Sequence, residues 1–364
     1  GAGGYGPVAG GMQGGGGMSG VQTRSVAPGE GDQRLDRWLR RQFPHLTQGQ
    51  IEKMCRKGEL RVEGGRVKSA TRLQEGQSVR IPPIPDPGTR PAPDATRISD
   101  ADAAMIRACV IYRDDHVIAL NKPPGLPVQG GSGQARHVDG LAEALRFGAE
   151  DKPRLVHRLD KDTSGVLVLA RSREAAKGLT AAFRHRATRK IYWAAVAGAP
   201  SPRVGTVRYG LVKAPGHGAG GEGEKMHCLH PRDVAGTPGA KAATTDYAMI
   251  ENAGGRVSWM ALTPVTGRTH QLRAHMAEIG HPIIGDGKYG GSGQENLGDG
   301  WGAQLGGEVS RKLHLHARSL TIEHPVTRAI LHLTAPLPAH MARTWDLFQW
   351  QASEAPEDPF EDLV

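Results

Sequence analysis

The part of the sequence that most constrains the fold is residues 157–170, which read HRLDKDTSGVLVLA. Residues 166–169 are a short apolar run of the kind that forms a buried strand. The residues before them form a polar loop that holds a histidine, an arginine and two aspartates. Such a loop places reactive side chains at the edge of a rigid sheet, where catalytic groups are commonly found. The pattern alone leaves a structural alternative, in which Asp160 caps the turn and Arg158 pairs with it.

A second polar cluster follows about a hundred residues later, at residues 266–273, which read TGRTHQLR. These residues open a helix that we predict over residues 270–279. Three hydrogen-bonding side chains and two guanidiniums at a helix start are suited to binding a phosphate or a carboxylate. The alternative is a basic helix face in water, but Leu272 and Met276 give the segment an apolar side.

The region from residue 106 to residue 350 is rich in short apolar runs, which predict strands with a few helices between them. Two Gly-rich stretches, 215–239 and 285–307, are typical of long surface loops. The predicted fold class is α+β, with a mixed or antiparallel sheet at its centre. The expected strands are 117–120, 166–169, 191–196, 257–262, 313–322 and 330–333, and the expected helices are 141–147, 173–185 and 270–279.

The ends of the chain differ from this central region in composition. Residues 1–31 are dominated by Gly, Ser and Pro, and we expect them to be disordered. Residues 32–83 predict a compact basic module of two helices and a small sheet, with a hairpin turn at Gly64-Gly65. A Pro-rich linker is expected over 84–105, and residues 351–364 form an acidic tail.

The charge of the chain indicates an anionic partner. The formal net charge is +9, and residues 34–80 alone hold 12 Lys and Arg against 5 Asp and Glu. Lysine and arginine gain free energy by displacing counterions from phosphates, so a concentrated surplus favours nucleic acid. Solubility is the ordinary explanation for the total charge, but it does not explain the concentration of charge in one module.

Several protein classes are disfavoured by the composition. Three scattered cysteines do not suggest a disulfide framework, which fits a reducing compartment. No apolar run approaches the roughly 20 residues that span a bilayer, and the N-terminal residues lack the order of a signal peptide. We therefore expect a cytoplasmic protein without a membrane partner.

Five motifs, in order along the chain, resemble those of the RluA-like pseudouridine synthases. HRLDKDTSG followed by VLVLA is similar to the central motif of that family, and TGRTHQLR followed by residues 281–286 (HPIIGD) is similar to a later one. The basic module resembles the αL RNA-binding motif, through residues 34–36 and 56–58. This layout is that of the RluC and RluD groups, which modify large-subunit ribosomal RNA. The other matching segments are residues 121–128, 190–192, 313–317 and 324–325.

The resemblance implies an isomerase that turns uridine into pseudouridine, on a mixed, mostly antiparallel sheet with flanking helices. It assigns the indispensable carboxylate to Asp160, acting either on ribose C1′ or as a base. Arg268 matches the arginine that pairs with this carboxylate, and a guanidinium favours the ionised form that either mechanism needs. Tyr192 matches the aromatic residue that stacks on the target uracil.

Further residues are expected to contact RNA. Arg158 resembles the arginine that replaces the flipped-out base in the RNA stack. Leu272 is expected to pack on the uracil or, alternatively, in the core. The remaining expected RNA contacts are His157 in the first cluster, Arg184, Arg186 and Lys190 just before Tyr192, and five residues of the basic module, namely Arg37, Arg40, Arg41, Arg56 and Lys57.

Two alternatives compete with the isomerase. A glycoside or nucleoside hydrolase would use Asp160 and Asp162, but two carboxylates two positions apart do not meet its spacing requirement. A non-catalytic, RNA-binding ribosome-assembly factor would not need Asp160 or Tyr192. No metal site is expected, because His227, Cys228 and His230 lack a second ligand pair. No cofactor is implied, and we expect a monomer.

Overall fold

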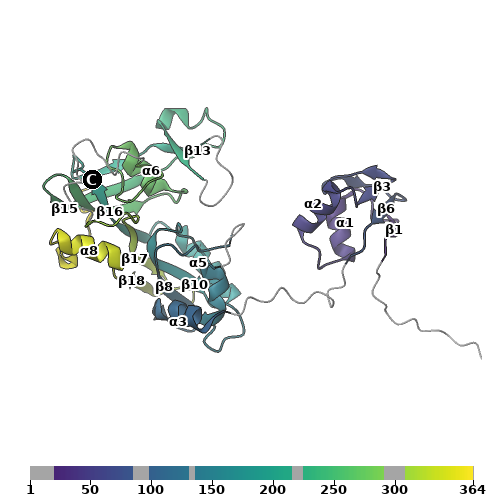
Figure 1. The fold of residues 1–364 in the computed structure, drawn as a ribbon, viewed down its shortest axis with the longest axis horizontal. Helices are drawn as coiled ribbons and strands as arrows, with labels where there is room; N and C mark the ends of the chain where they lie inside the picture. Colours follow the sequence, from purple (N-terminus) through teal and green to yellow (C-terminus); the bar gives the residue numbers. More distant parts are fainter. Residues whose placement is uncertain (1–19, 85–97, 131–135, 215–223, 291–307, 364) are drawn as a thin grey trace, which may run out of the picture. The chain divides into compact units, whose positions relative to one another are not determined.

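The structure is a computed structural model that describes residues 20–84, 98–130, 136–214, 224–290 and 308–363. The chain divides into two compact units, Gly1–Arg97 and Ile98–Val364. Figure 1 shows the secondary structure of both units, and each unit has its own buried hydrophobic residues.

The N-terminal unit contains two helices and a small sheet with the strand order β1-β6-β3-β4, beside a separate β2-β5 pair. The two helices expected in the basic module are confirmed. The turn between β3 and β4 passes through Glu63 and Gly64, which both have positive φ, as a tight hairpin requires. The element bounds are β1 Gln22–Ser25, β2 Gln33–Arg34, α1 Leu35–Gln42, α2 Gln48–Arg56, β3 Arg61–Val62, β4 Gly65–Arg66, β5 Arg72–Leu73 and β6 Ser78–Ile81.

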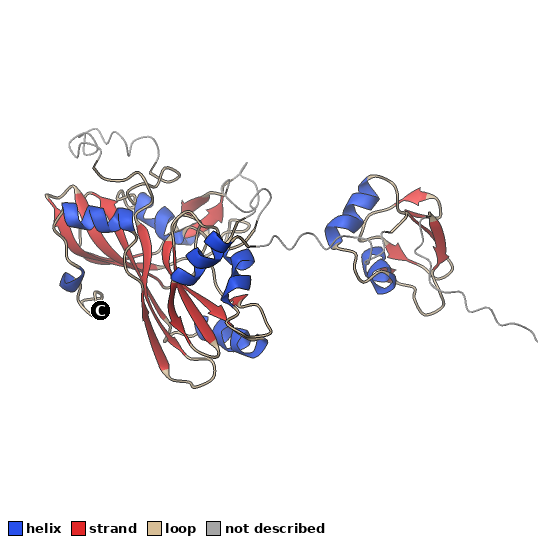
Figure 2. Cartoon of the chain, turned by 60° about the horizontal axis from the view of Figure 1, so that its bottom comes forward, coloured by secondary structure: helices blue, strands red, loops and turns tan. Residues whose placement is uncertain are grey.

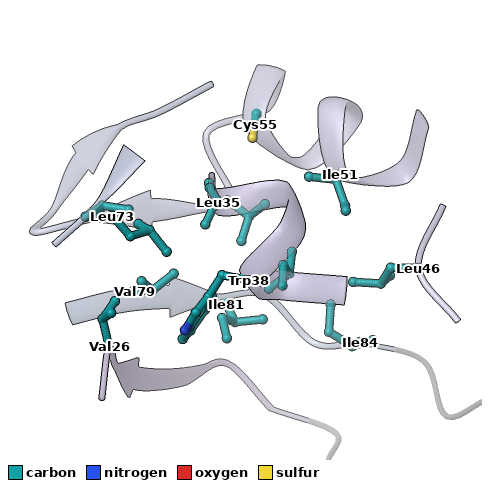
Figure 3. Packing of buried hydrophobic residues seen from close by; sticks show 13 residues of the cluster. Val26, Leu35, Trp38, Leu46, Ile51, Cys55, Leu73, Val79, Ile81 and Ile84 are labelled. Carbon is teal, nitrogen blue, oxygen red and sulfur yellow. The ribbon is translucent and has the colours of Figure 1, made fainter. Parts of the chain in front are cut away.

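The apolar faces of the two helices meet the sheet in a single core (Figure 3). Trp38 of α1 and Ile51 of α2 pack in one buried cluster with Val79 and Ile81 of β6. Helix α2 begins at a capping box, in which Thr47 accepts a hydrogen bond from the Gln50 amide and the Gln50 side chain accepts one from the Thr47 amide.

The expected disorder of residues 1–31 is wrong for residues 20–31, while residues 1–19 lie outside the described residues. Strand β1 pairs antiparallel with β6 in the register Gln22↔Ile81, and Val26 after it is buried. The short alternating run in 22–25 is stable because an existing strand supplies its hydrogen-bond partners, a tertiary effect that local composition does not report.

The C-terminal unit is built on a ten-stranded sheet. Eight of the strands follow the order β12-β15-β16-β11-β17-β10-β8-β7, and the other two are β18, which pairs with β17, and β9, which pairs with β10. All pairings are antiparallel except β10 with β17. The predicted mixed, mostly antiparallel sheet is confirmed. The strands are β7 Val110–Arg113, β8 Val117–Lys122, β9 Arg154–Leu155, β10 Ser164–Ala170, β11 Arg189–Ala197, β12 Val204–Val207, β15 Thr245–Ala253, β16 Val257–Pro264, β17 Leu315–Glu323 and β18 Ile330–Thr334, with a separate hairpin of β13 Gly210–Lys213 and β14 Met226–Leu229.

Helices cover both faces of this sheet (Figure 2), because successive strand residues point to opposite sides. On β10, Val168 packs in the cluster that contains α5, whereas Leu167 packs with α3 and α4. On β16, Trp259 packs with α8, whereas Met260 packs with α6. The helices are α3 Asp100–Ala108, α4 Val138–Leu141, α5 Arg173–Phe183, α6 Gln271–Glu278 and α8 Ala339–Leu347.

The two halves of the sheet join where β10 meets β17. The parallel register pairs Ser164 with His316 and Gly165 with Ala317. His316 Nε2 lies 2.9 Å from the Ala335 carbonyl oxygen and must donate to it, so Nδ1 accepts the Ser164 hydroxyl proton at 2.8 Å. Gly165 has φ +116°, and a Cβ there would lie 2.2 Å from the Ala317 carbonyl oxygen. This junction therefore requires glycine directly after the polar loop.

Three further boundaries differ from expectation. The expected linker 84–105 contains the start of α3, whose Ile106 is buried under the sheet, while residues 85–97 lie outside the described residues. The acidic tail packs on the unit through buried Phe360 and an Arg189–Asp358 ion pair of 2.6 Å. The helix expected over 141–147 is instead α4 followed by a 3₁₀ turn, Ala142–Leu145. In each case tertiary packing overrides a local composition signal.

The expected loop 215–239 contains β14 and a 3₁₀ turn, Pro231–Asp233, in its described part. Strand β14 forms because β13 offers it a complete ladder, from Gly210↔Leu229 to Lys213↔Met226. The expected loop 285–307 is described only to residue 290, and that part carries side chains of the site below.

We predict that Gly165→Ala destabilises the protein by about 3 kcal/mol, because it combines a positive φ with a clash against β17 backbone. The matched control is Gly254→Ala, which has φ +59° and no atom within 4 Å of the new Cβ, and which should cost about 1 kcal/mol. Urea unfolding of both variants measures the difference. Equal losses would show that the close β10–β17 approach is not a constraint.

Candidate active site

The polar loop before β10 is anchored by a buried lysine, Lys122. Lys122 Nζ donates to the carbonyl oxygens of Pro123 (2.9 Å), Leu126 (2.9 Å) and Lys161 (2.8 Å). Burial lowers the pKa of Lys122 to about 7, against the opposing charges of Asp162 and Asp160. Lys122 Nζ thus joins Lys161 of the loop to the segment after β8, and this contact restrains the loop and Asp160 with it.

Asp160 faces two groups of helix α6. Its Oδ2 lies 3.7 Å from Arg273 Nη1, and its Oδ1 lies 3.8 Å from His270 Nε2. The side chain of Asp160 is 33% exposed, whereas those of His270 and Arg273 are 8% and 12% exposed. The carboxylate is thus open on one side to a substrate and backed on the other by nitrogen donors.

Arg273 is itself held by a second carboxylate. Its Nε and Nη2 donate to Asp286 at 3.0 and 2.8 Å, a bidentate pair in which Asp286 is completely buried. Although burial opposes it, the hydrogen bonds and charge of Asp286, followed by the charge of Asp160, raise the pKa of Arg273. This leaves Nη1 as the guanidinium nitrogen nearest Asp160.

The expected pairing of Arg268 with Asp160 is wrong. Arg268 is exposed, and its Nε donates to the carbonyl oxygen of Ala242 at 3.0 Å. The physical reason is the start of α6: Gln271 is buried and binds the Thr266 hydroxyl and the Arg268 amide through its Oε1. That contact turns residues 266–268 away, so the arginine one helical turn into α6 reaches Asp160 instead.

Tyr192 also lies within the electrostatic reach of Asp160. Burial, and then the negative charge of Asp160, raise the pKa of the Tyr192 hydroxyl, which stays protonated. Tyr192 lies on β11 at a register shift, where the strand pairs with Leu262 of β16 and Ala317 of β17. It packs against the cluster that holds Leu272, which is buried at 6% exposure in α6. Leu272 therefore belongs to the core that supports Tyr192.

His157 occupies a structural position. Its Nε2 accepts a hydrogen bond from the Val168 amide at 2.8 Å, and its ring stacks on Phe183 with centroids 4.3 Å apart. Lys190 Nζ lies 5.2 Å from the centroid of Phe183. Burial, and then the charge of Lys190, lower the pKa of His157 to about 3. A neutral, accepting imidazole of this kind fixes the loop to β10.

The other expected RNA contacts are surface groups. Arg158, Arg184 and Arg186 are exposed, as are all five expected residues of the N-terminal unit. Three of these line a shallow hollow with Arg34, Asp36 and Gln48, namely Arg37, Arg40 and Arg41. Although burial opposes it, hydrogen bonds from Arg34, Gln48 and the Arg37 amide lower the pKa of Asp36. Arg56 and Lys57 lie at the end of α2, and Lys57 is 3.9 Å from Glu59.

Sequence reasoning missed Arg273, Asp286, Tyr289 and Lys122, and gave His270 no role of its own. Two signals were present: Arg273 is three residues after His270, on the same face of a predicted helix, and Asp286 is the carboxylate of the HPIIGD segment. Neither signal identifies the residue that Arg273 or Asp286 contacts, because those contacts form only in the tertiary structure.

Comparison with known proteins agrees with this geometry. The family described as RNA pseudouridylate synthase matches residues 116–278, and the S4 domain family matches residues 33–79. The ribosomal large subunit pseudouridine synthase C of Vibrio cholerae is 36% identical over 88% of this chain and 95% of its own length. The chain belongs to the RNA pseudouridine synthase family. It is therefore an RNA-modifying isomerase, and RNA is its partner.

A further relative and a solved structure also resemble this pseudouridine synthase. The protein of the same description from Salmonella typhi is 33% identical over 91% of this chain and 98% of its own length. The solved structure of human RNA pseudouridylate synthase domain containing 4 has a TM-score of 0.54 at 29% identity, and it covers 68% of this chain and 95% of its own. Among the described helices, none has the length and apolarity that crossing a membrane requires.

We predict that His157→Gln makes the stability of the synthase less sensitive to acid. The folded state keeps His157 neutral down to about pH 3, whereas the unfolded chain binds a proton below about pH 6.5. Stability is therefore lost as pH falls through this window, by at most about 1.4 kcal/mol per pH unit from this group. Urea unfolding at pH 7.5 and 5.0 measures the slope, and an unchanged slope in the variant would contradict the structural role.

Proposed function

We propose that this synthase converts uridine to pseudouridine in large-subunit ribosomal RNA, with Asp160 as the catalytic carboxylate. The observation that carries the proposal is the partly exposed carboxylate of Asp160, which lies beside the guanidinium of Arg273 and within the electrostatic influence of the protonated Tyr192. The names of the curated relatives, which are ribosomal large subunit pseudouridine synthases, support the choice of RNA. We further propose that the enzyme acts in the cytoplasm as a monomer, since one chain supplies all of these groups.

The chemistry explains why one ionised carboxylate is central. The bond from ribose C1′ to uracil N1 breaks, the base turns, and a new bond joins C1′ to C5. The sugar becomes electron-poor as the base departs, so Asp160 either adds to C1′ or removes a proton from C2′. In both cases the guanidinium of Arg273 gives the carboxylate a positive partner on the side away from solvent, and Asp286 keeps the guanidinium in place.

Tyr192 is suited to hold the uracil while the base turns. A protonated phenol on a buried strand offers a flat ring for stacking and a hydroxyl for a uracil oxygen. The core that includes Leu272 supports the ring from behind. Arg158 is exposed two residues before Asp160 in the same loop, and we propose that it fills the gap that the flipped base leaves in the RNA stack.

We predict that Asp160→Asn lowers the single-turnover rate of pseudouridine formation by on the order of 10⁴-fold, because the amide neither adds to C1′ nor accepts a proton. Ribosomal RNA transcripts are the substrate, and carbodiimide-stop primer extension maps the product. The matched control is Asp162→Asn, an exposed carboxylate two residues away, which should retain activity. Product formation by Asp160→Asn, or release of free uracil, would contradict the assignment, and activity on transfer RNA transcripts alone would contradict the ribosomal target.

We also predict that the hollow on α1 contributes phosphate contacts. Replacing Arg37, Arg40 and Arg41 together by Gln should reduce the slope of log affinity against log salt by about 2 to 3, since each phosphate contact contributes about 0.9. Filter binding to the ribosomal transcript at several salt concentrations measures this slope. The control replaces Lys68, Arg72 and Arg80, which are exposed outside the hollow. Equal effects of the two triple variants would argue against a localised contact.

A further inference from the structure

A chain of polar contacts leads from strand β14 through Tyr289 and His270 to Asp160. The Met226 amide donates to Tyr289 Oη at 3.0 Å, and Tyr289 Oη lies 2.7 Å from His270 Nδ1. His270 Nε2 then lies 3.8 Å from Asp160 Oδ1. The two rings meet edge to face, with centroids 5.6 Å apart.

The contacts at both ends of the imidazole favour the same tautomer. The Met226 amide occupies an acceptor site of Tyr289 Oη, which leaves the hydroxyl proton for His270 Nδ1. At the other end, an unprotonated Nε2 would turn its lone pair toward the Asp160 carboxylate, which is repulsive. A proton on Nε2 and none on Nδ1 satisfies both neighbours.

The imidazole is held in a conformation that a histidine rarely adopts. His270 has φ +52° and ψ +21°, in the left-handed region, directly before α6. For a residue with a side chain this costs about 1 kcal/mol or more, and it persists only where the surroundings enforce it. The next residue, Gln271, is buried and anchored to Thr244 and Thr245 of the neighbouring β15 edge. The anchor at Gln271 thus lies directly beside the strained residue that faces Asp160.

Two positive and two negative side chains act on the pKa of His270 in opposite directions. Arg273 of α6 and Lys288, two residues after the HPIIGD segment, disfavour a charged imidazole, whereas Asp160 of the loop and Glu224 before β14 favour it. Burial is the largest effect, and it lowers the pKa of His270. The imidazole is thus neutral at physiological pH.

We propose that His270 is a positioning residue for Asp160: Tyr289 holds it as the neutral Nε2–H tautomer, and with RNA bound its Nε2–H donates to the carboxylate opposite Arg273. The proposal rests on the catalytic role of Asp160 proposed above. A neutral donor orients the carboxylate without adding a second full positive charge beside a ribose that becomes electron-poor. Catalytic hydrogen bonds are often long before substrate binds, and a small rotation of the half-open Asp160 side chain shortens this contact.

The decisive measurement is the pH dependence of the single-turnover rate on the ribosomal transcript, with saturating enzyme, from pH 5 to pH 9. In Tyr289→Phe the imidazole loses the hydroxyl that keeps Nδ1 unprotonated, so it charges at higher pH and pairs with Asp160. We expect the acid limb of the profile to move to higher pH by about half a unit or more. The apparent affinity for the transcript should stay within about twofold of wild type.

Variants at position 270 separate positioning from packing. His270→Gln keeps a neutral N–H donor and should retain a rate within about tenfold of wild type. His270→Asn tolerates the left-handed backbone but is too short to reach Asp160, and it should lose about 100-fold. The double variant Tyr289→Phe with His270→Gln should show no shift of the acid limb, because no imidazole remains to titrate. Thermal unfolding of every variant confirms that the fold is intact.

An unshifted acid limb in Tyr289→Phe, or a shift that persists in the double variant, overturns the proposal. Equal rates for His270→Gln and His270→Asn overturn it as well. If the Asn variant does not fold, the comparison of Tyr289→Phe with the double variant still decides. An inactive Asp160→Asn together with wild-type behaviour of all His270 and Tyr289 variants rejects only this inference, whereas an active Asp160→Asn rejects the proposed function itself.

Discussion

The site depends on one shared guanidinium. Arg273 binds Asp286 with two nitrogens and presents the third to Asp160. A guanidinium has a rigid planar fork, so fixing two nitrogens on a buried carboxylate also fixes the direction of the third. A lysine at this position would bind either carboxylate as a point charge and would orient neither. The geometry around Asp160 therefore depends on the Arg273–Asp286 pair behind it.

The sheet explains how these groups come together from distant parts of the sequence. Asp160 precedes β10, Tyr192 lies on β11, and Arg273 belongs to the helix that follows β16. Strand β17 lies between β10 and β11, and its parallel register with β10 begins at Ser164 and Gly165. The close approach that Gly165 permits thus sets the separation between the loop of Asp160 and the strand of Tyr192.

The strands and the two polar clusters were predictable because they are local. An apolar run such as 166–169 must be buried, and polar groups beside it must lie at the edge of the sheet. The choice between Arg268 and Arg273 was not predictable in this way, because both belong to one motif, and the contacts of Gln271 together with the left-handed turn at His270 determine which arginine faces Asp160. For the same reason β1 and Phe360 escaped detection, since what stabilises each of them is a partner far away in the chain.

The charge at the site explains why the enzyme needs basic surfaces elsewhere. Arg273 and Asp286 cancel, while His270 and Tyr192 are neutral, so the carboxylate of Asp160 leaves about one negative charge facing the substrate. In the proposed reaction that charge would stabilise an electron-poor ribose, while it repels the phosphates on either side of it. We therefore expect affinity for RNA to come from other side chains, such as Arg158, Arg184 and Arg186 on the same unit and the arginines of α1 on the other. The proposed mechanism requires negative charge at the reacting sugar and positive charge at the phosphates, and different side chains of this chain would supply the two.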